Sequence, residues 1–241
     1  MWIVRIAFRN LLRQRRRTVL TGLMVTVGYL LCSLSLGLGK GTYASIIEFF
    51  TSYRTGHVQI HARGYRDAPS LYATVDRWRE IGKRLETVPE VIAWAPRVLA
   101  PALAFSDAGK TSGVQLFGLD PAQEAATTTL PRRLLRGKWL ADGEADNRVL
   151  VDEGLARLLR LEVGSAVYLI GEGADGSIAN DVFEVIGIVQ GAGGFAERNV
   201  YLPLPAAQRF LVLGDRVHEL VLRTRKTGGG SAARRSAWRR S

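Results

Sequence analysis

Apolar residues dominate one long stretch near the start of the chain. Between Arg17 and Lys40 lie 22 residues without a charge. As an α-helix rising ~1.5 Å per residue, this stretch would be about 33 Å long, which is enough to cross the hydrocarbon core of a bilayer. A cleaved signal sequence would have a shorter apolar run, and residues 36–41 offer only a poor cleavage site. The pattern therefore predicts a retained transmembrane helix over residues 18–39.

Charged residues flank this predicted span unequally. Six arginines and no acid precede it, whereas Lys40 and then Glu48 follow it. Because positively charged flanks stay in the cytoplasm, the N-terminus is predicted to be cytoplasmic and the chain after Gly39 extracytoplasmic. The residues assigned to this topology are Arg13, Arg15, Arg16, Arg17 and Lys40.

Helical spacing of apolar residues continues on both sides of the span. In residues 1–17 it predicts a basic amphipathic segment that lies on the membrane surface, and a solvated arm is the alternative. In residues 40–55 the same spacing predicts a stalk helix that continues outward from the membrane.

Residues 56–223 alternate between strand-like and helix-like patterns. Period-two alternation and short apolar runs predict strands, and apolar residues three and four apart predict helices. The result is an α+β domain with two β-α-β-type halves, over residues 57–119 and 181–223, and an inserted subdomain at about 120–180. Predicted strands cover 56–65, 91–94, 98–105, 113–119, 148–151, 166–170, 182–191, 199–204 and 215–224, and predicted helices cover 75–88, capped by Thr74, 122–135, 152–160 and 205–213.

Basic residues are concentrated at the two ends of the chain. The net charge of +11 suggests nucleic-acid binding, but 13 of the 33 basic residues precede the span or follow Leu222, where there is no acid. Residues 18–222 therefore hold 20 basic and 22 acidic residues, a net charge of −2. A nearly neutral domain offers no basic groove, so nucleic acid is not an expected partner. Residues 224–241, rich in glycine and arginine, are predicted to be a disordered basic tail.

Few residues suggest a chemical role. The single cysteine lies in the predicted span, which excludes an internal disulfide. The sequence contains neither a Walker-type phosphate loop nor a G-x-S-x-G motif. His57 and His61 resemble a metal pair, but residues four apart on one face of a strand are separated by ~13 Å, so solvated or capping histidines are predicted. No catalytic, cofactor or metal site is expected, and an enzyme is the weakest functional hypothesis.

Several short motifs follow one another in an order and spacing that together are fairly specific. They are AFRNLLRQRRRTVLT at 7–21, GHVQIHARGY at 56–65, APRVLAPALAF at 95–105, GLDP at 118–121, LLRGKWL at 134–140, VLVDEGLARLLRLEVGSAVYL at 149–169 and VFEVIGIVQGAGGFAERNVYLPLPAAQRFL at 182–211. In these motifs the chain resembles the MacB/FtsX-type ABC transporter permeases, with a slight lean toward the lipoprotein-releasing LolC/LolE branch. The resemblance assigns structural motif positions to Gly56, Gly118, Asp120, Pro121, Gly137, Leu140 and Gly187.

The resemblance implies a permease subunit in a bacterial inner membrane, working with a separate cytoplasmic ABC ATPase and a second permease subunit in a homo- or heterodimer. Its MacB-like periplasmic core domain would extrude or release substrates such as lipoproteins, peptides or amphipathic drugs. Such permeases carry three further membrane helices, whereas no apolar span follows Leu222. The chain is therefore expected to be a truncated permease or a fragment of one. A single-pass, membrane-anchored binding or adaptor protein without transport activity is the alternative.

Overall fold

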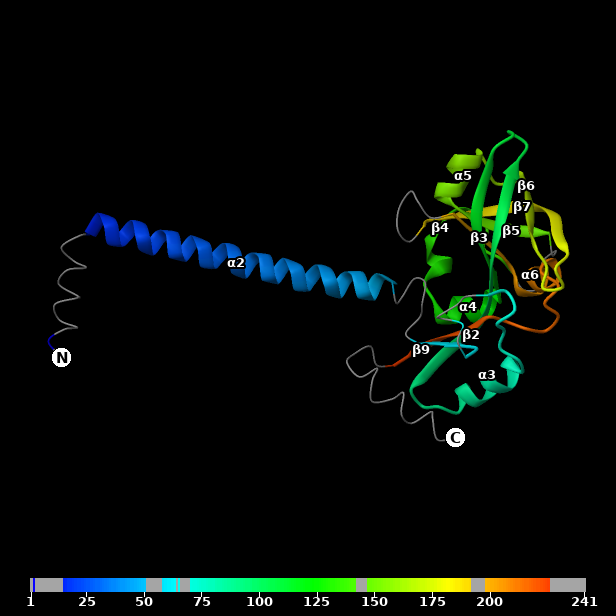
Figure 1. Cartoon of the computed structure of the whole chain (residues 1–241), viewed down its shortest axis with the longest axis horizontal. Helices are drawn as coiled ribbons and strands as arrows, with labels where there is room; N and C mark the ends of the chain where they lie inside the picture. The colour runs from blue at the N-terminus through cyan, green and yellow to red at the C-terminus, as the bar shows by residue number, and fades with distance from the viewer. Residues whose placement is uncertain are drawn as a thin grey trace. The chain divides into compact units, whose positions relative to one another are not determined.

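The computed structural model describes residues 2, 15–50, 58–63, 65, 70–141, 147–191 and 198–225. The chain divides into two compact units, Met1–Phe49 and Phe50–Ser241. Helix α2, Arg15–Phe50, forms most of the first unit and is drawn in blue in Figure 1.

Helix α2 contains the whole predicted span 18–39 and continues beyond it as one element of 36 residues. Small and hydroxylated residues interrupt its larger apolar side chains; Thr21 and Thr26, for example, donate hydrogen bonds to backbone carbonyls four residues earlier. Among the helix residues that the structure describes, no stretch is long and apolar enough to cross a membrane. The transmembrane helix over 18–39 and the stalk over 40–55 therefore stay predictions.

The strands described in the second unit form a single mixed sheet. Its order is β1-β9-β2-β3-β8-β5-β7-β4, and β6 pairs with both β2 and β7. Most neighbours are antiparallel, but β3 pairs with β8 and β5 with β7 in parallel. The strands are β1 Val58–His61, β2 Val91–Ser106, β3 Thr111–Leu119, β4 Leu134–Gly137, β5 Arg148–Asp152, β6 Ala166–Glu172, β7 Ile178–Val189, β8 Asn199–Pro203 and β9 Glu219–Thr224.

Short helices lie between these strands along the chain, and this mixture confirms the predicted α+β class (Figure 1). They are α3 Trp78–Glu86, α4 Pro121–Thr127, the 3₁₀ helix η2 Leu130–Arg133, α5 Glu153–Leu159 and α6 Leu204–Phe210. The strands that lie wholly in the region expected as an insert, β4, β5 and β6, are hydrogen-bonded into the same sheet as the rest. The division into two halves and an insert stays a prediction.

Strand β2 organises the sheet because it is long enough to pair with three other strands. Its first part pairs with β9, and its second part lies between β3 and β6. Alternate residues such as Val98, Ala100 and Ala104 point into the main hydrophobic core. A second, smaller core contains Leu140 and Tyr201, with Leu99 of β2 packed against it. Both faces of β2 are thus buried over part of its length.

Three local predictions differ from the structure. The helix predicted over 122–135 ends at Thr127 as α4, and the chain continues as η2 and then as β4, because residues 134–137 pair with β7. Helix α3 begins at Trp78 instead of residue 75, and its N-cap is Arg77, not Thr74. The reason is that Val75 is held extended by an antiparallel bridge to Val217, whose carbonyl accepts a 2.7 Å hydrogen bond from the Val75 N–H. The strands predicted at 91–94 and 98–105 are one continuous strand, because β9 pairs with β2 across the intervening Pro96.

Candidate functional site

The GLDP motif links β3 to α4. Strand β3 ends at Leu119, and Asp120 is the N-cap of α4, where its Oδ1 accepts a 2.9 Å hydrogen bond from the backbone N–H of Gln123. Pro121 occupies the first turn, where a missing N–H costs nothing. Such a cap stabilises a helix by ~1 kcal/mol, so this aspartate and proline determine where α4 starts.

Gly118 allows close packing between β3 and α6. A Cβ atom at this position would lie 2.3 Å from the Cβ of Ala207 and 3.1 Å from the Cβ of Val98. The helix therefore rests directly on the strand backbone, and only glycine leaves room for it.

Gly137 and Gly187 are register partners where β4 pairs with β7. Gly137 has a φ of 82°, and a Cβ there would lie 2.1 Å from the Ile186 carbonyl oxygen. A Cβ at Gly187 would lie 2.5 Å from the carbonyl oxygen of Lys138. Leu140 follows and is buried in the second core. These three motif residues thus keep two backbones in close contact beside that core.

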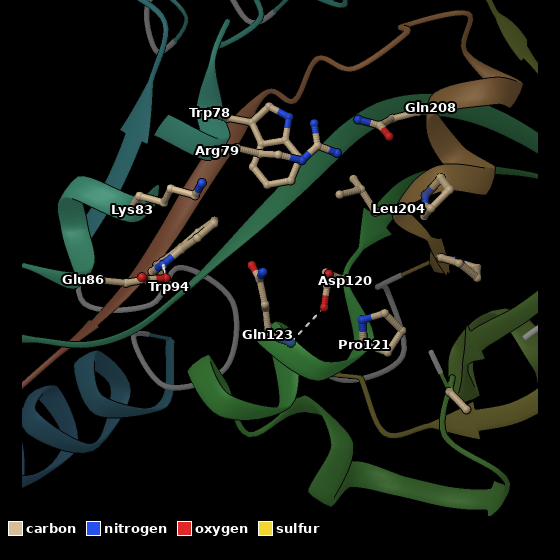
Figure 2. A pocket seen from close by; sticks show the side chains of 13 residues that line it. Trp78, Arg79, Lys83, Glu86, Trp94, Asp120, Pro121, Gln123, Leu204 and Gln208 are labelled. Carbon is tan, nitrogen blue, oxygen red and sulfur yellow. Dashed lines mark hydrogen bonds between the residues drawn. The ribbon is translucent and has the colours of Figure 1, made fainter. Parts of the chain in front are cut away.

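An open groove of about 500 Å³ lies beside the GLDP motif. Figure 2 shows Lys83, Glu86 and Trp94 on one side, Asp120 and Gln123 below, and Leu204 and Gln208 on the opposite side. The helices α3, α4 and α6 therefore each contribute to its walls. The residues that line it are Trp78, Arg79, Lys83, Glu86, Trp94, Asp120, Pro121, Gln123, Ala141, Pro203, Leu204, Pro205 and Gln208.

Two tryptophans shape one wall of this groove. The rings of Trp78 and Trp94 meet edge to face with centroids 6.2 Å apart, and the Arg79 guanidinium lies 4.3 Å from the centre of the Trp78 ring. Arg79 also pairs with Asp215, and the Trp94 indole N–H donates to Glu86. This wall thus combines two aromatic rings with a guanidinium and a carboxylate, which suits it to contact with a partner surface.

A buried ionic cluster lies between β2, β9 and α4. The Arg97 Nε and Nη2 atoms donate to the two carboxylate oxygens of Glu124 at 3.0 and 2.5 Å, and its Nη1 lies 3.5 Å from Glu219. All three side chains are at most 4% exposed. Burial alone would lower the pKa of Arg97, but the charges of Glu124 and Glu219 outweigh it and raise that pKa above its usual value. The arginine is therefore permanently charged.

Aromatic and histidine side chains extend this cluster. The His61 ring stacks on Tyr65 with centroids 5.0 Å apart, and its Nε2 lies 3.8 Å from Glu219. The sequence predicts a solvated or capping histidine; His61 is only 20% exposed, beside Glu219 and Tyr65, so the solvated alternative does not hold. His218 accepts from the Leu99 N–H at Nδ1, which leaves Nε2–H to donate to the Leu71 carbonyl. Burial lowers the pKa of His218, so its ring is neutral.

The sequence did not single out Arg97, Glu124 or Glu219. The available signal was a charged residue within an apolar stretch, as in APRVLAPALAF and HELVL. Such a residue is rarely buried without a partner, so Arg97 and Glu219 each implied an unseen contact. Over the part of the chain that the structure describes, no group of three or more histidine, cysteine or acidic residues is placed to hold a metal ion.

The predicted topology residues lie mainly on α2. Arg15 is its first residue, Arg16 and Arg17 follow with exposed side chains, and Lys40 lies further along the same helix. Arg13, like the motif position Gly56, falls outside the described residues. The structure thus places most of these cations at the N-terminal end of one helix, and their role in orientation stays a prediction.

Comparison with known proteins defines the class. The chain belongs to the family of the MacB-like periplasmic core domain, whose sequence profile matches residues 18–237. This domain is the extracytoplasmic part of MacB/FtsX-type ABC transporter permeases. A curated relative is the lipoprotein-releasing system transmembrane protein LolC of Neisseria meningitidis serogroup B, 32% identical over 120 residues. That alignment covers 47% of this chain but only 28% of the length of LolC.

Solved structures agree on the fold. The periplasmic region of MacB from Actinobacillus actinomycetemcomitans superposes with a TM-score of 0.52 at 16% identity, covering 80% of this chain and 85% of the other. The extracellular domain of the noncanonic ABC-type transporter YknZ from Gram-positive bacteria gives 0.50 at 13% identity, with 70% and 83% covered. At these identities the likeness concerns the fold alone.

Proposed function

We propose that the chain is a permease subunit, or its N-terminal part, of a MacB/FtsX-type ABC transporter. In this proposal a separate cytoplasmic ATPase drives movement of the extracytoplasmic domain, which extrudes or releases a substrate such as a lipoprotein. The observation that carries the proposal is the family match, because it starts at residue 18 and so includes α2 as well as the sheet domain. The similarity to LolC favours the lipoprotein-releasing branch.

Helix α2 supports a membrane anchor through its exposed apolar side chains. Large apolar side chains that face outward along a helix favour an apolar environment, which a bilayer supplies. Within α2 the structure describes side chains only as far as residue 35, whereas the uncharged part of the sequence continues to Gly39. The exposed residues are Val19, Leu20, Leu23, Met24, Val25, Val27, Tyr29, Leu30, Leu31 and Leu34.

Labelling of single cysteines tests the proposed topology. Cys32 is the only native cysteine, so Cys32→Ser provides a clean background. In intact cells a membrane-impermeant maleimide is expected to label Ala108→Cys, which lies in the exposed turn between β2 and β3. Trp2→Cys, 83% exposed, should react only after permeabilisation. Labelling of both or neither variant in intact cells would contradict the topology.

Co-purification separates transport from the adaptor alternative. The tagged full chain, extracted from native membranes in mild detergent, is expected to retain an ABC-type ATPase in an ATP-dependent manner. The control reverses Arg15, Arg16 and Arg17 to glutamate, which should disturb the cytoplasmic placement of the N-terminus and so reduce ATPase recovery at least several-fold. Recovery of the chain without any ATPase, while the labelling result holds, would favour a single-pass binding or adaptor protein.

A further inference from the structure

Hydrogen-bond donors on the walls of the groove beside the GLDP motif are largely engaged within the domain. The Trp94 indole N–H donates to a carboxylate oxygen of Glu86 at 3.2 Å. The Trp78 indole N–H and the Gln208 amide nitrogen donate to backbone carbonyls at 3.2 and 3.0 Å. Arg79 is held by an ion pair to a carboxylate of the same domain. A ligand that needs donors from these side chains would therefore have to break existing contacts.

Oxygen acceptors on the same walls remain open. In the described contacts Asp120 accepts through Oδ1 and Glu86 through Oε1, which leaves one oxygen of each carboxylate. The Gln123 side-chain oxygen is buried and has no hydrogen-bond partner among the residues that the structure describes. Figure 2 shows the Gln123 side chain rising from α4 into the groove. Because the terminal torsion of a glutamine is soft, a small rotation of the amide presents this oxygen to a ligand.

The first turns of α4 and α6 border the groove but add few N–H donors to it. Asp120 already accepts from the first turn of α4. In α6, Pro203 is the N-cap and Pro205 is the second residue. Two of the four N–H groups that the start of a helix leaves free are therefore missing in α6. An anionic ligand would thus find little to bind it at either helix.

Charged side chains on the groove walls favour a positively charged ligand. Of the two lining cations, Arg79 is already paired, and Lys83 has no partner among the residues that the structure describes. The carboxylates of Glu86 and Asp120 line the groove together with this single unpaired ammonium group. Residues 142–146 follow one lining residue in the sequence and include three acids and no base, so they contribute no competing cation.

Trp94 gives the groove a fixed aromatic surface. A Cβ atom at Gly82 of α3 would lie only 2.2 Å from the Trp94 ring, so the ring rests directly on the helix. Trp78 meets this ring edge to face, and Glu86 holds its indole N–H. A ring that is already fixed binds a cation with little loss of side-chain entropy. Arg79 lies 4.3 Å from the centre of the Trp78 ring, so the same wall already contains one contact between a guanidinium and a tryptophan.

We propose that this groove binds an arginine side chain, presented by an extended segment of a protein partner. The guanidinium stacks on Trp94 and donates its N–H groups to the open oxygens around it. Arginine fits better than lysine, because its planar group carries five donors and stacks on aromatic rings. A proline-rich ligand fits less well, since the indole N–H groups of Trp78 and Trp94 are engaged and cannot bind its carbonyls. The volume of about 500 Å³ accommodates the arginine and its nearest neighbours.

Peptide binding to the tagged full chain in mild detergent tests this proposal. The probe is the peptide Gly-Leu-Arg-Leu-Gly, acetylated and amidated, and matched peptides carry citrulline, lysine or glutamate in place of the arginine. Thermophoresis of the labelled chain is expected to give binding about tenfold tighter for arginine than for its uncharged isostere citrulline. It should also be about threefold tighter than for lysine. Equal binding of the arginine and citrulline peptides, or tighter binding of the glutamate peptide, would overturn the proposal.

Variants of the lining residues locate the binding site. Glu86→Gln should weaken binding of the arginine peptide about fivefold, although the glutamine oxygen can still accept from the indole N–H. The matched control is Glu153→Gln on the exposed surface of α5, which should change nothing. Gln123→Glu adds a carboxylate and should strengthen binding about threefold, a gain that partial unfolding cannot produce. An unchanged affinity in Gln123→Glu, or equal losses in the two glutamate variants, would show that the arginine does not bind in the groove.

The arginines of the chain's own tail are the alternative occupant. A full-length variant in which all four are replaced by glutamine should bind the arginine peptide as the wild type does. If the peptide bound only this variant, the tail would fill the groove and the proposed partner would be wrong. The inference goes beyond the proposed function, and these measurements need no ATPase, so its failure leaves the topology and co-purification results unaffected. The four residues are Arg234, Arg235, Arg239 and Arg240.

Discussion

Replacing Arg97 with methionine is expected to lower the free energy of unfolding by about 3–5 kcal/mol near neutral pH. The substitution removes the only cation that contacts both Glu124 and Glu219 among the ion pairs described, so two carboxylates stay buried without it. Methionine keeps much of the side-chain volume, which limits the cavity. Urea unfolding of the full chain, followed by tryptophan fluorescence, measures the loss.

An exposed arginine provides the control for this experiment. Arg157 pairs with Glu153 one helical turn away, and its side chain is 54% exposed. Arg157→Met should therefore change the free energy of unfolding by less than about 0.5 kcal/mol. If Arg97→Met were equally mild, the buried cluster would contribute no net stability and its charges would have to be compensated in another way. Adding Glu124→Gln to Arg97→Met should recover part of the loss, because one buried charge disappears with it.

Strands and helices could be predicted from the sequence where burial or exposure of each position determines whether its residue is apolar or polar. The alternation in GHVQIHARGY marks β1, and the apolar run at 113–119 marks β3, because each side chain reports which face of the sheet it occupies. The start of α3 could not be predicted in this way. Its position depends on a bridge between Val75 and Val217, which are far apart in the sequence.

The difference between local contacts and contacts between distant residues also explains what could be predicted of the candidate site. The resemblance identified Asp120 and Pro121, and their cap and first-turn roles are local, so the motif contains the whole interaction. The ionic cluster joins residues separated by 27 and 122 positions, and no local pattern links them. Strand order β1-β9-β2 is what brings His61, Glu219 and Arg97 into one row. A charge within an apolar run can therefore signal a buried contact without revealing its partner.

Replacing Gly137 with alanine is expected to destabilise the domain by about 2–4 kcal/mol, through two separable costs. The backbone has a φ of 82°, where a Cβ is strained, and that Cβ would also lie 2.1 Å from the Ile186 carbonyl oxygen. That oxygen accepts a 2.9 Å hydrogen bond from the Lys138 N–H, so relieving the clash would pull β4 away from β7.

Gly176 separates these two costs. Its φ of 80° is nearly the same, but no atom lies within 4 Å of the position that a Cβ would occupy. Gly176→Ala should therefore show only the conformational cost of about 1 kcal/mol. The difference between the two variants in chemical unfolding measures the close contact between β4 and β7. Equal losses in the free energy of unfolding would mean that β4 shifts freely and that Gly137 is required only for its backbone conformation. A larger loss at Gly137 would mean that the close contact between β4 and β7 needs glycine at this position.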